Sequence, residues 1–322
     1  MQQATEISKI KNVNKNFVLK PRNFNRAEYL ERVDRNVGWI TKSEQKILRS
    51  MTVGIAGCGG MGGLLGSILV RLGIGHIKLA DLESFDASNI NRQFGAQKNS
   101  IGQSKALVTA QMLRNIADDT HIYVYPRGIS ADSIHSFTQG CDIICDEIEF
   151  WAIGSRLLLH HAIDKGTVIF NGNSVGMGTR VFRFTNTSPY KMRDLLKIDV
   201  GQALEIQNRI QNETATAAER KMVMETVIKG LVPRIPEYCA MNQDFLNKDE
   251  VQKRLIIESK APIIATNPPM AAGFLANQIL MDILRRFSTI DRVFVYPPDM
   301  PGYIYFDTAL LKAEVVRGIW WD

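Results

Sequence analysis

A group of glycines stands where the sequence predicts a turn between a strand and a helix. Gly57, Gly59 and Gly62 form a G-x-G-x-x-G motif, and Gly60 makes the turn still more permissive. In such a turn the backbone amides can approach a phosphate, and the helix dipole adds to the attraction. Asp81 follows Gly62 by about 20 residues, at the end of the next predicted strand, where a carboxylate can accept hydrogen bonds from ribose hydroxyls. The spacing predicts an adenine nucleotide site, without separating ATP from NAD or FAD.

Amide and cationic side chains follow the second predicted strand. They are Asn89, Arg92 and Gln93, with Lys105 at the start of the next predicted helix. A triphosphate requires several cations and amide donors, whereas a nicotinamide ring requires a flat apolar slot. This segment therefore favours ATP. An NAD(P)-dependent oxidoreductase remains an alternative that rests on the glycine motif and Asp81 alone.

Asp146 ends the apolar run CDIICD, which is predicted to be a strand. Doubly wound sheets bind ligands at the carboxyl ends of their strands, and a carboxylate there suits a hard cation such as magnesium. Asp146 is thus predicted to be a magnesium ligand, with a helix N-cap as the alternative. The cysteines at 58, 141, 145 and 239 form no C-x-x-C pair, so structural zinc is not expected.

Short apolar runs alternate with amphipathic segments along the first half of the chain. This alternation is typical of βαβ units and a parallel sheet. The predicted strands are 52–57, 76–81, 121–126 and 141–146, and the predicted helices are 62–73, 103–116 and about 151–164. The run TVIFNG continues the sheet, and 178–184 begins an antiparallel extension. The expected fold class is α/β, a Rossmann-like, mostly parallel sheet flanked by helices.

The flanking regions have different patterns. Residues 27–48 look helical, which would place Arg32 and Arg35 on one helical face. Polar helices between about 187 and 261 suggest a helical insertion beside the ligand site. Pro268 and Pro269 open an apolar helix. Terminal strands are expected at RVFVYP, GYIYFD and AEVVRGIWW. We therefore divide the chain into an N-terminal arm (1–27), a nucleotide-binding domain (28–185), and a helical insertion with the helix and strands that complete that domain (186–322).

Composition excludes several classes of protein. The net charge of +6 comes from 39 basic and 33 acidic residues that are scattered along the chain, so nucleic-acid binding is not expected. No apolar run approaches the roughly 20 residues needed to cross a bilayer, and the N-terminus lacks the apolar region of a secretory signal. These features predict a cytoplasmic protein that does not enter membranes.

Four segments resemble, in order and spacing, the ThiF/MoeB/HesA family, relatives of the ubiquitin-activating enzymes. The segments are GIAGCGGMGG, LADLESFDASNINRQFG, GQSKA and CDIICDEIEFWAIGSR. The resemblance implies that the glycine loop holds ATP, that Asp81 holds ribose, and that Asn89, Arg92, Gln93 and Lys105 surround the phosphates. It also implies that Asp146 coordinates magnesium. By the same resemblance, Arg35 reaches the nucleotide of the partner subunit in a homodimer.

The resemblance further implies an activity, the adenylation of a carboxylate by ATP with release of pyrophosphate. The acceptor would be a partner protein, such as a ubiquitin-like or sulfur-carrier protein, or a ribosomal peptide. The missing zinc pairs favour the peptide-modifying branch. Cys239 is the one cysteine placed where thioester-forming members carry their nucleophile, and the sequence leaves its role open. A nucleotide-binding protein without catalysis is a further alternative.

Overall fold

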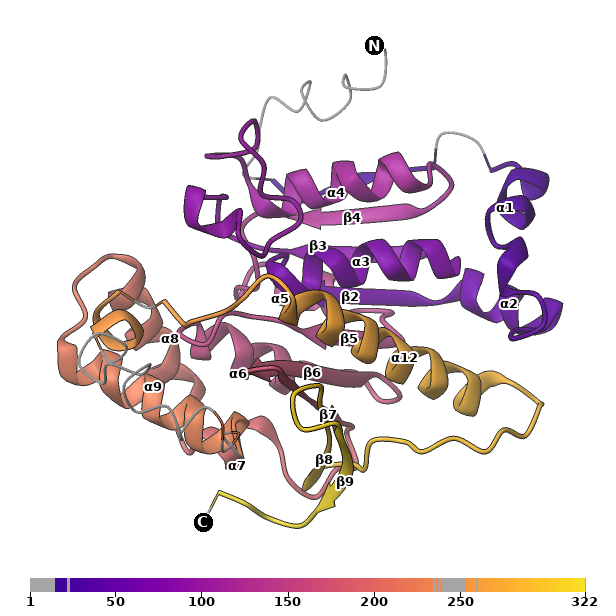
Figure 1. Ribbon diagram of the computed structural model, residues 1–322. Helices are drawn as coiled ribbons and strands as arrows, with labels where there is room; N and C mark the ends of the chain where they lie inside the picture. Colours follow the sequence, from indigo (N-terminus) through magenta and orange to yellow (C-terminus); the bar gives the residue numbers. More distant parts are fainter. Residues whose placement is uncertain are drawn as a thin grey trace.

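The computed structural model describes residues 15–21, 24–233, 236, 238, 253–258 and 260–321. Within these residues the chain forms one nine-stranded sheet in the order β1-β4-β3-β2-β5-β6-β7-β8-β9 (Figure 1). The strands are β1 (Phe17–Leu19), β2 (Thr52–Ala56), β3 (His76–Ala80), β4 (His121–Tyr125), β5 (Ile143–Asp146), β6 (Val168–Val175), β7 (Gly178–Phe184), β8 (Gly302–Asp307) and β9 (Lys312–Arg317).

The central strands β4, β3, β2, β5 and β6 are parallel, whereas β7, β8 and β9 add to the sheet in antiparallel pairs. This arrangement confirms the predicted fold class, including its antiparallel extension. Ala56 at the end of β2 pairs with Ala80 on one side and Asp146 on the other. The strand order reverses at β2, and doubly wound sheets bind ligands at such a reversal.

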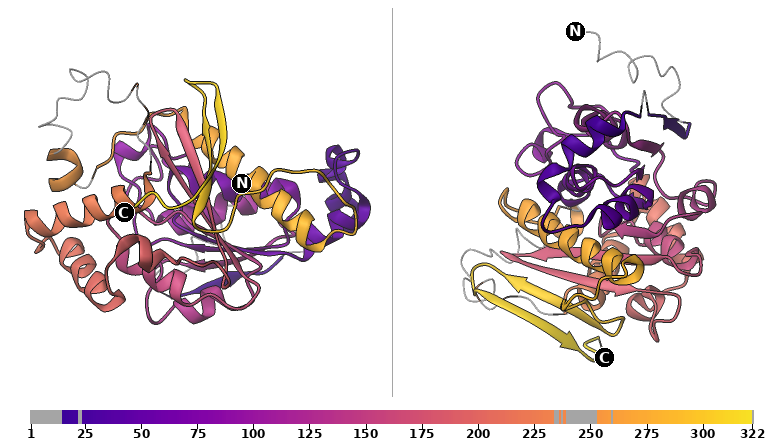
Figure 2. Two further views of the ribbon diagram at one scale, coloured as in Figure 1. Left: turned by 90° about the horizontal axis from the view of Figure 1, so that it is seen from below. Right: turned by 90° about the vertical axis from the view of Figure 1, so that its right-hand side faces the viewer.

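Helices cover both faces of the sheet (Figures 1 and 2). One hydrophobic core packs α3 (Gly60–Leu72), α4 (Lys105–Ile116) and α12 (Asn267–Phe287) against the sheet. The other contains α5 (Ile134–Thr138), α6 (Ile153–His161), α7 (Met192–Leu196), α8 (Val200–Gln211) and α9 (Ala217–Leu231). Neighbouring strand residues belong to opposite cores, for example Ile55 to the first and Ala56 to the second, because side chains alternate along a strand.

The region predicted as one helix over 27–48 is broken. It consists of α1 (Arg26–Arg32), a 3-10 turn η3 (Asp34–Asn36) and α2 (Lys42–Ser50). Gly38 has a φ of 101°, which a continuing helix does not allow, and Thr41 caps α2 in a reciprocal box with Glu44. Arg32 therefore ends α1 while Arg35 lies in η3, and the two do not share one helical face.

Two other expectations need correction. Residues 292–297 form no strand. Side-chain contacts hold this segment instead. Arg292 donates to Glu44 of α2, at 2.7 Å between Nη2 and Oε2, and the Arg285 guanidinium stacks on the Tyr296 ring. The last strand ends at Arg317, before the two tryptophans.

In the predicted N-terminal arm, Phe17–Leu19 pairs with β4 as an edge strand. The division into domains stays a prediction.

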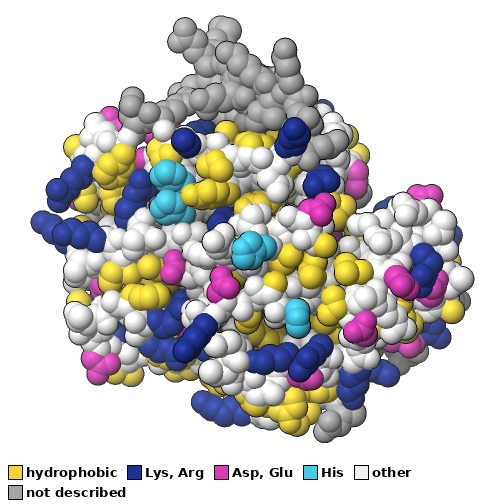
Figure 3. Space-filling model, turned by 180° about the vertical axis from the view of Figure 1, so that it is seen from behind, with side chains coloured by type: hydrophobic (Ala, Val, Ile, Leu, Met, Phe, Trp, Pro, Cys, Tyr) yellow, Lys and Arg dark blue, Asp and Glu magenta, His cyan; other side chains and the backbone are white. Residues whose placement is uncertain are grey.

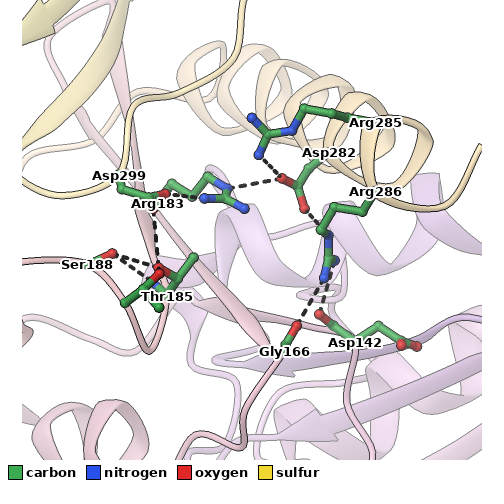
Figure 4. A network of polar contacts seen from close by, with 10 residues as sticks. Asp142, Gly166, Arg183, Thr185, Ser188, Asp282, Arg285, Arg286 and Asp299 are labelled. Atoms are coloured by element: carbon green, nitrogen blue, oxygen red, sulfur yellow. Dashed lines mark hydrogen bonds and ion pairs between the residues drawn. The ribbon is translucent and has the colours of Figure 1, made fainter. Parts of the chain in front are cut away.

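A buried ionic network fastens α12 to the sheet (Figure 4). Asp282 has no exposed surface and forms ion pairs with Arg183 of β7 and with Arg285 and Arg286 of its own helix. Arg286 also donates to the carbonyls of Gly166 and Asp142, which precede β6 and β5. The network thus links the C-terminal half of α12 to three strands of the sheet.

In the described part of the chain, no helix combines the length and hydrophobicity required to traverse a membrane. On the face drawn in Figure 3, basic side chains are interspersed with acidic and apolar ones and do not gather in one patch. This distribution agrees with the scattered charges of the sequence.

Candidate active site

The glycine loop joins β2 to α3 and fits tightly against the loop that follows β5. Gly57 has a φ of 103°, and a Cβ there would lie 2.0 Å from the carbonyl oxygen of Glu147. A Cβ on Gly62 would lie 1.9 Å from the carbonyl oxygen of Gly57. Contacts this close leave no room for a side chain, so both positions require glycine. The amide of Gly57 donates to Ala80 at 2.7 Å, which joins the loop to the end of β3.

A pocket opens beside this loop, at the carboxyl ends of β2, β3 and β5. Its apolar walls are formed by Leu82, Ile129, Ile148 and Trp151. Its charged lining residues are Asp81, Glu83, Lys105, Glu147 and Glu149. A narrow apolar slot next to a glycine loop suits a purine ring attached to phosphates, and the pocket lies at the reversal in strand order.

Asp81 lies at the end of β3, as predicted, and holds two backbone amides. Its carboxylate accepts hydrogen bonds from the amide of Cys58, at 2.6 Å, and from that of Glu83, at 2.8 Å. Burial raises the pKa of Asp81 to about 6, against the opposing charge of Lys105. The carboxylate thus fixes the glycine loop to the segment after β3, and its remaining lone pairs are available to a ribose.

Lys105 is the buried cation of the pocket, only 3% exposed. Its ammonium group lies 2.6 Å from the Glu83 carboxylate. Burial acts to lower the pKa of Lys105, but the charges of Glu83 and Asp81 outweigh it and raise the pKa. The side chain is therefore charged at neutral pH, next to the glycine loop where phosphates would lie.

Asp146 ends β5, as predicted. Its carboxylate is fully buried and is not part of the pocket lining. Instead it faces α6, where Arg156 lies 3.0 Å and His160 3.0 Å from the same oxygen. Burial acts to raise the pKa of Asp146, but Arg156 and the hydrogen bond from His160 outweigh it and lower the pKa. In this structure Asp146 is an internal ion-pair partner, and its role as a magnesium ligand stays a prediction.

The carboxylates that reach the pocket from this loop are Glu147 and Glu149. Burial, reinforced by the nearby Asp146 carboxylate, raises the pKa of Glu147 well above its usual range. Burial and the charge of Glu83 raise the pKa of Glu149, while the cations Lys105 and Arg92 act in the opposite direction. Of these two carboxylates, Glu149 is therefore the one for which the charge of Lys105, the cation that lines the pocket, opposes the rise in pKa.

The predicted amide and cationic residues are brought to different places. Gln93 is buried against the glycine loop, 3.6 Å from where a Cβ on Gly59 would stand. Arg92 is partly exposed and donates to the carbonyl of Ser88 at 3.1 Å. Asn89 ends the 3-10 helix η4 (Ala87–Asn89), and its side-chain amide bonds within that turn. Its Oδ1 accepts the backbone amide of Asp86, and its Nδ2 donates to the Asp86 carboxylate.

Two further predicted residues lie outside this pocket. Arg35 is exposed in η3, between α1 and α2. These two helices lie at the end of the sheet where the strands begin (Figure 1), whereas the pocket lies at the end where they finish. Cys239 lies outside the described residues. Cys58, Cys141 and Cys145 are buried free thiols.

A glycine loop, an acidic residue ending β3 and a buried lysine at the reversal point together define a nucleotide-binding α/β protein. The chain belongs to the ThiF family, whose model matches residues 33–297.

Individual relatives match shorter parts of the chain. It is 34% identical over 110 residues to ubiquitin-like modifier-activating enzyme 5 of Bombyx mori, covering 34% of this chain and 27% of that protein. It is 28% identical over 140 residues to the sulfur carrier protein ThiS adenylyltransferase of Bacillus subtilis, covering 42% of this chain and 41% of that protein. The chain thus spans less than half the length of these curated relatives.

Solved structures match over a longer stretch at lower identity. A crystal structure of PaaA has a TM-score of 0.59 and 14% identity, over 91% of this chain and 76% of that one. The crystal structure of Escherichia coli MccB with ATP has a TM-score of 0.56 and 16% identity, over 92% of this chain and 73% of that one. At this identity the similarity establishes a shared fold.

Proposed function

We propose that this chain is an ATP-dependent adenylyltransferase that acts on a carboxylate of a protein or peptide. A carboxylate oxygen of the acceptor forms a bond to the α-phosphorus of ATP, and the bond from that phosphorus to the β-bridging oxygen breaks. Pyrophosphate leaves with those electrons, and the acceptor becomes an acyl-adenylate. The observation that carries the proposal is the charged, buried Lys105 beside the glycine loop of a ThiF-family chain.

The pocket offers a place for each part of ATP. Leu82, Ile148 and Trp151 provide apolar walls for the adenine ring, and Asp81 lies at the end of β3 for the ribose. The glycine-loop amides and Lys105 would bind the phosphates and stabilise the charge that develops on them. The step needs no protein nucleophile, so the role of Cys239 concerns only the later fate of the adenylate.

Magnesium fits this set of donors. Within the described ranges, no three or more His, Cys, Asp or Glu side chains are arranged to hold a metal by themselves. Mg²⁺ in nucleotide sites is typically bound through one or two carboxylates together with phosphate oxygens and water. Glu149, with Glu83 beside it, would hold the ion in place of Asp146. When bound, the ion neutralises charge on the phosphates.

A wide groove of about 1100 Å³ adjoins the nucleotide pocket and offers an approach for the acceptor. The two share Leu82, Glu83 and Trp151. The far wall of the groove includes Ile210 at the end of α8 and Arg220 in α9, which supports an approach of the acceptor along these helices. The groove is lined by apolar groups together with charged groups of both signs, which suits a peptide chain. We assign the protein to the cytoplasm because the reaction consumes ATP.

Ligand preference separates adenylation from the oxidoreductase alternative. We expect Mg·ATP to raise the melting temperature more than NAD or NADP at equal concentration, because Lys105 favours a triphosphate over a nicotinamide ring. At about 100 times the Kd, bound ATP should stabilise the fold by about 2.7 kcal/mol. Differential scanning fluorimetry measures the shift. A larger shift with NAD would refute the proposal. If Mg·ATP gives the larger shift, exchange of labelled pyrophosphate into ATP in the presence of candidate acceptor peptides tests the chemistry directly.

We further propose a homodimer in which Arg35 of one chain completes the ATP site of the other. Arg35 is exposed and lies at the opposite end of the sheet from its own pocket, so it is free to reach a partner. Arg35→Ala should weaken Mg·ATP binding roughly 10- to 150-fold, because a hydrogen bond to a charged group contributes about 1.5–3 kcal/mol.

Mixed dimers test whether the arginine acts across the interface. A heterodimer of Arg35→Ala and Lys105→Met chains has one site with both residues intact and one site that lacks both. Calorimetry on heterodimers purified with two different tags should therefore recover tight ATP binding at half of the sites. If tight binding does not return, Arg35 does not serve the partner.

A further inference from the structure

Three buried side chains meet behind the loop that carries Glu149. They are Asp146, Arg156 and His160, which are 0%, 4% and 9% exposed. The Nε atom of Arg156 donates to both oxygens of Asp146, at 3.2 and 3.0 Å, and Nε2 of His160 lies 3.0 Å from Oδ2. A carboxylate this deeply buried must be paired, and here both partners come from α6.

Arg156 also binds the loop itself. Its Nη2 donates to the carbonyl oxygen of Ile148, and the amide of Ile148 donates to Oδ1 of Asp146 at 3.2 Å. Residues 146–148 are therefore held by one guanidinium that contacts both a side chain and the backbone. The next residue is Glu149, whose carbonyl accepts the amide of Ala152 at 3.0 Å. The position from which Glu149 enters the pocket is thus fixed on both sides.

The helix that carries Arg156 is itself anchored. Ser155 donates through its hydroxyl to the carbonyl of Ile129, at 2.8 Å, and its amide donates to the side chain of Gln207 in α8, at 2.9 Å.

Arg156 forms its bonds to Asp146 and Ile148 from separate donor nitrogens. This arrangement needs the fixed, planar geometry of a guanidinium, which the single ammonium group of a lysine cannot reproduce. The contacts of Arg156 consequently make it the link between this anchored helix and the rim of the pocket.

We propose that Arg156 is a positioning residue of the nucleotide site: it acts through Asp146 and Ile148 to hold the 146–149 loop so that Glu149 faces Lys105 and the phosphates of Mg·ATP. The inference rests on the proposed function, since it concerns the same pocket. It also gives Asp146 a place in the site that does not require contact with a metal.

The test is a double-mutant cycle on Mg·ATP binding, measured by calorimetry across a range of Mg²⁺ concentrations. Arg156→Lys should raise the Kd roughly 10- to 100-fold, the usual effect of losing a partner that orients a metal-binding group. Glu149→Gln should produce a loss of similar size. The double variant should be little worse than either one alone, because each substitution removes the same contact. Additive losses, or unchanged binding by Arg156→Lys, would overturn the proposal.

Arg286→Lys is the matched control. Arg286 also joins a buried carboxylate, that of Asp282, to backbone carbonyls, but it does so at the end of the sheet where the strands begin. It should lower the melting temperature and leave the Kd for Mg·ATP unchanged. An equal rise in Kd in this control would show that general destabilisation accounts for the effect and would overturn the inference.

A second variant covers the case in which Arg156→Lys does not fold. Asp146→Asn keeps the size of the side chain and removes one of its two acceptor oxygens, so it should also raise the Kd, by less than Arg156→Lys. Unchanged binding by a folded Asp146→Asn protein contradicts the proposal. If the wild-type protein itself does not bind Mg·ATP, the proposed function fails, whereas tight binding by the wild type and by all loop variants removes only the role of Arg156.

Discussion

Asp282→Ala is expected to destabilise the fold by about 3–5 kcal/mol, the cost of removing one partner from a buried ion pair. Asp282 is fully buried, and its carboxylate forms ion pairs with Arg183, Arg285 and Arg286. Without it, Arg183 and Arg286 would remain inside the protein with less compensation, and α12 would lose its ionic contact with β7 (Figure 4). Urea unfolding followed by circular dichroism measures the loss.

Glu225→Ala provides the comparison for this experiment. Glu225 pairs with Lys221 on the surface of α9, at 3.9 Å, with both side chains more than half exposed. Exposed pairs of this kind contribute about 0–1 kcal/mol, so this variant should unfold close to the wild type. If Asp282→Ala unfolds at the same urea concentration as Glu225→Ala, the network does not hold α12 to the sheet.

Lys105→Met should weaken the binding of Mg·ATP roughly 10- to 150-fold, because a charged hydrogen bond to phosphate contributes about 1.5–3 kcal/mol. Methionine keeps most of the length and apolar volume of lysine but carries no charge. The variant also leaves Glu83 and Asp81 without their cation, and these carboxylates would repel the phosphates. Isothermal calorimetry gives the Kd without requiring an acceptor.

Lys98→Met separates this local effect from a general loss of positive charge. Lys98 is exposed in the same long connection between β3 and α4 and does not line the pocket. Its substitution should leave the Kd for Mg·ATP unchanged. Comparable weakening by the two variants would mean that Lys105 contributes only to the overall field of the protein.

The parallel core was predictable from the sequence because each strand is a short apolar run and each helix an amphipathic one. The glycine loop was predictable because its G-x-G-x-x-G motif follows a strand and precedes a helix. The structure explains the motif, since Gly57 and Gly62 stand where the backbone leaves no room for a Cβ. The break between α1 and α2 also had a signal in the sequence, namely Gly38 and the Thr41–Glu44 capping box. Over such a short range these two features outweigh helical periodicity.

The orientation of the Asp146 side chain shows where sequence patterns stop being informative. A residue that ends a buried strand can point to either face of the sheet, and only tertiary contacts decide which. The relevant partners, Arg156 and His160, lie four residues apart on the next helix and so share one face of it. That spacing was visible in the sequence. Its meaning depended on the packing of α6 beneath the sheet, and no local pattern specifies that packing.

The two edge strands of the sheet affect how copies of this protein can associate. Among the described residues, the sheet finishes on one side with β1, which is three residues long, and on the other with β9, which carries Lys312, Glu314 and Arg317. Very short edge strands and charged edge residues discourage strands of other molecules from pairing with the open backbone groups. Self-association by continuation of the sheet, the first step toward a fibre, is therefore disfavoured, and contacts between copies are directed to the helices and loops.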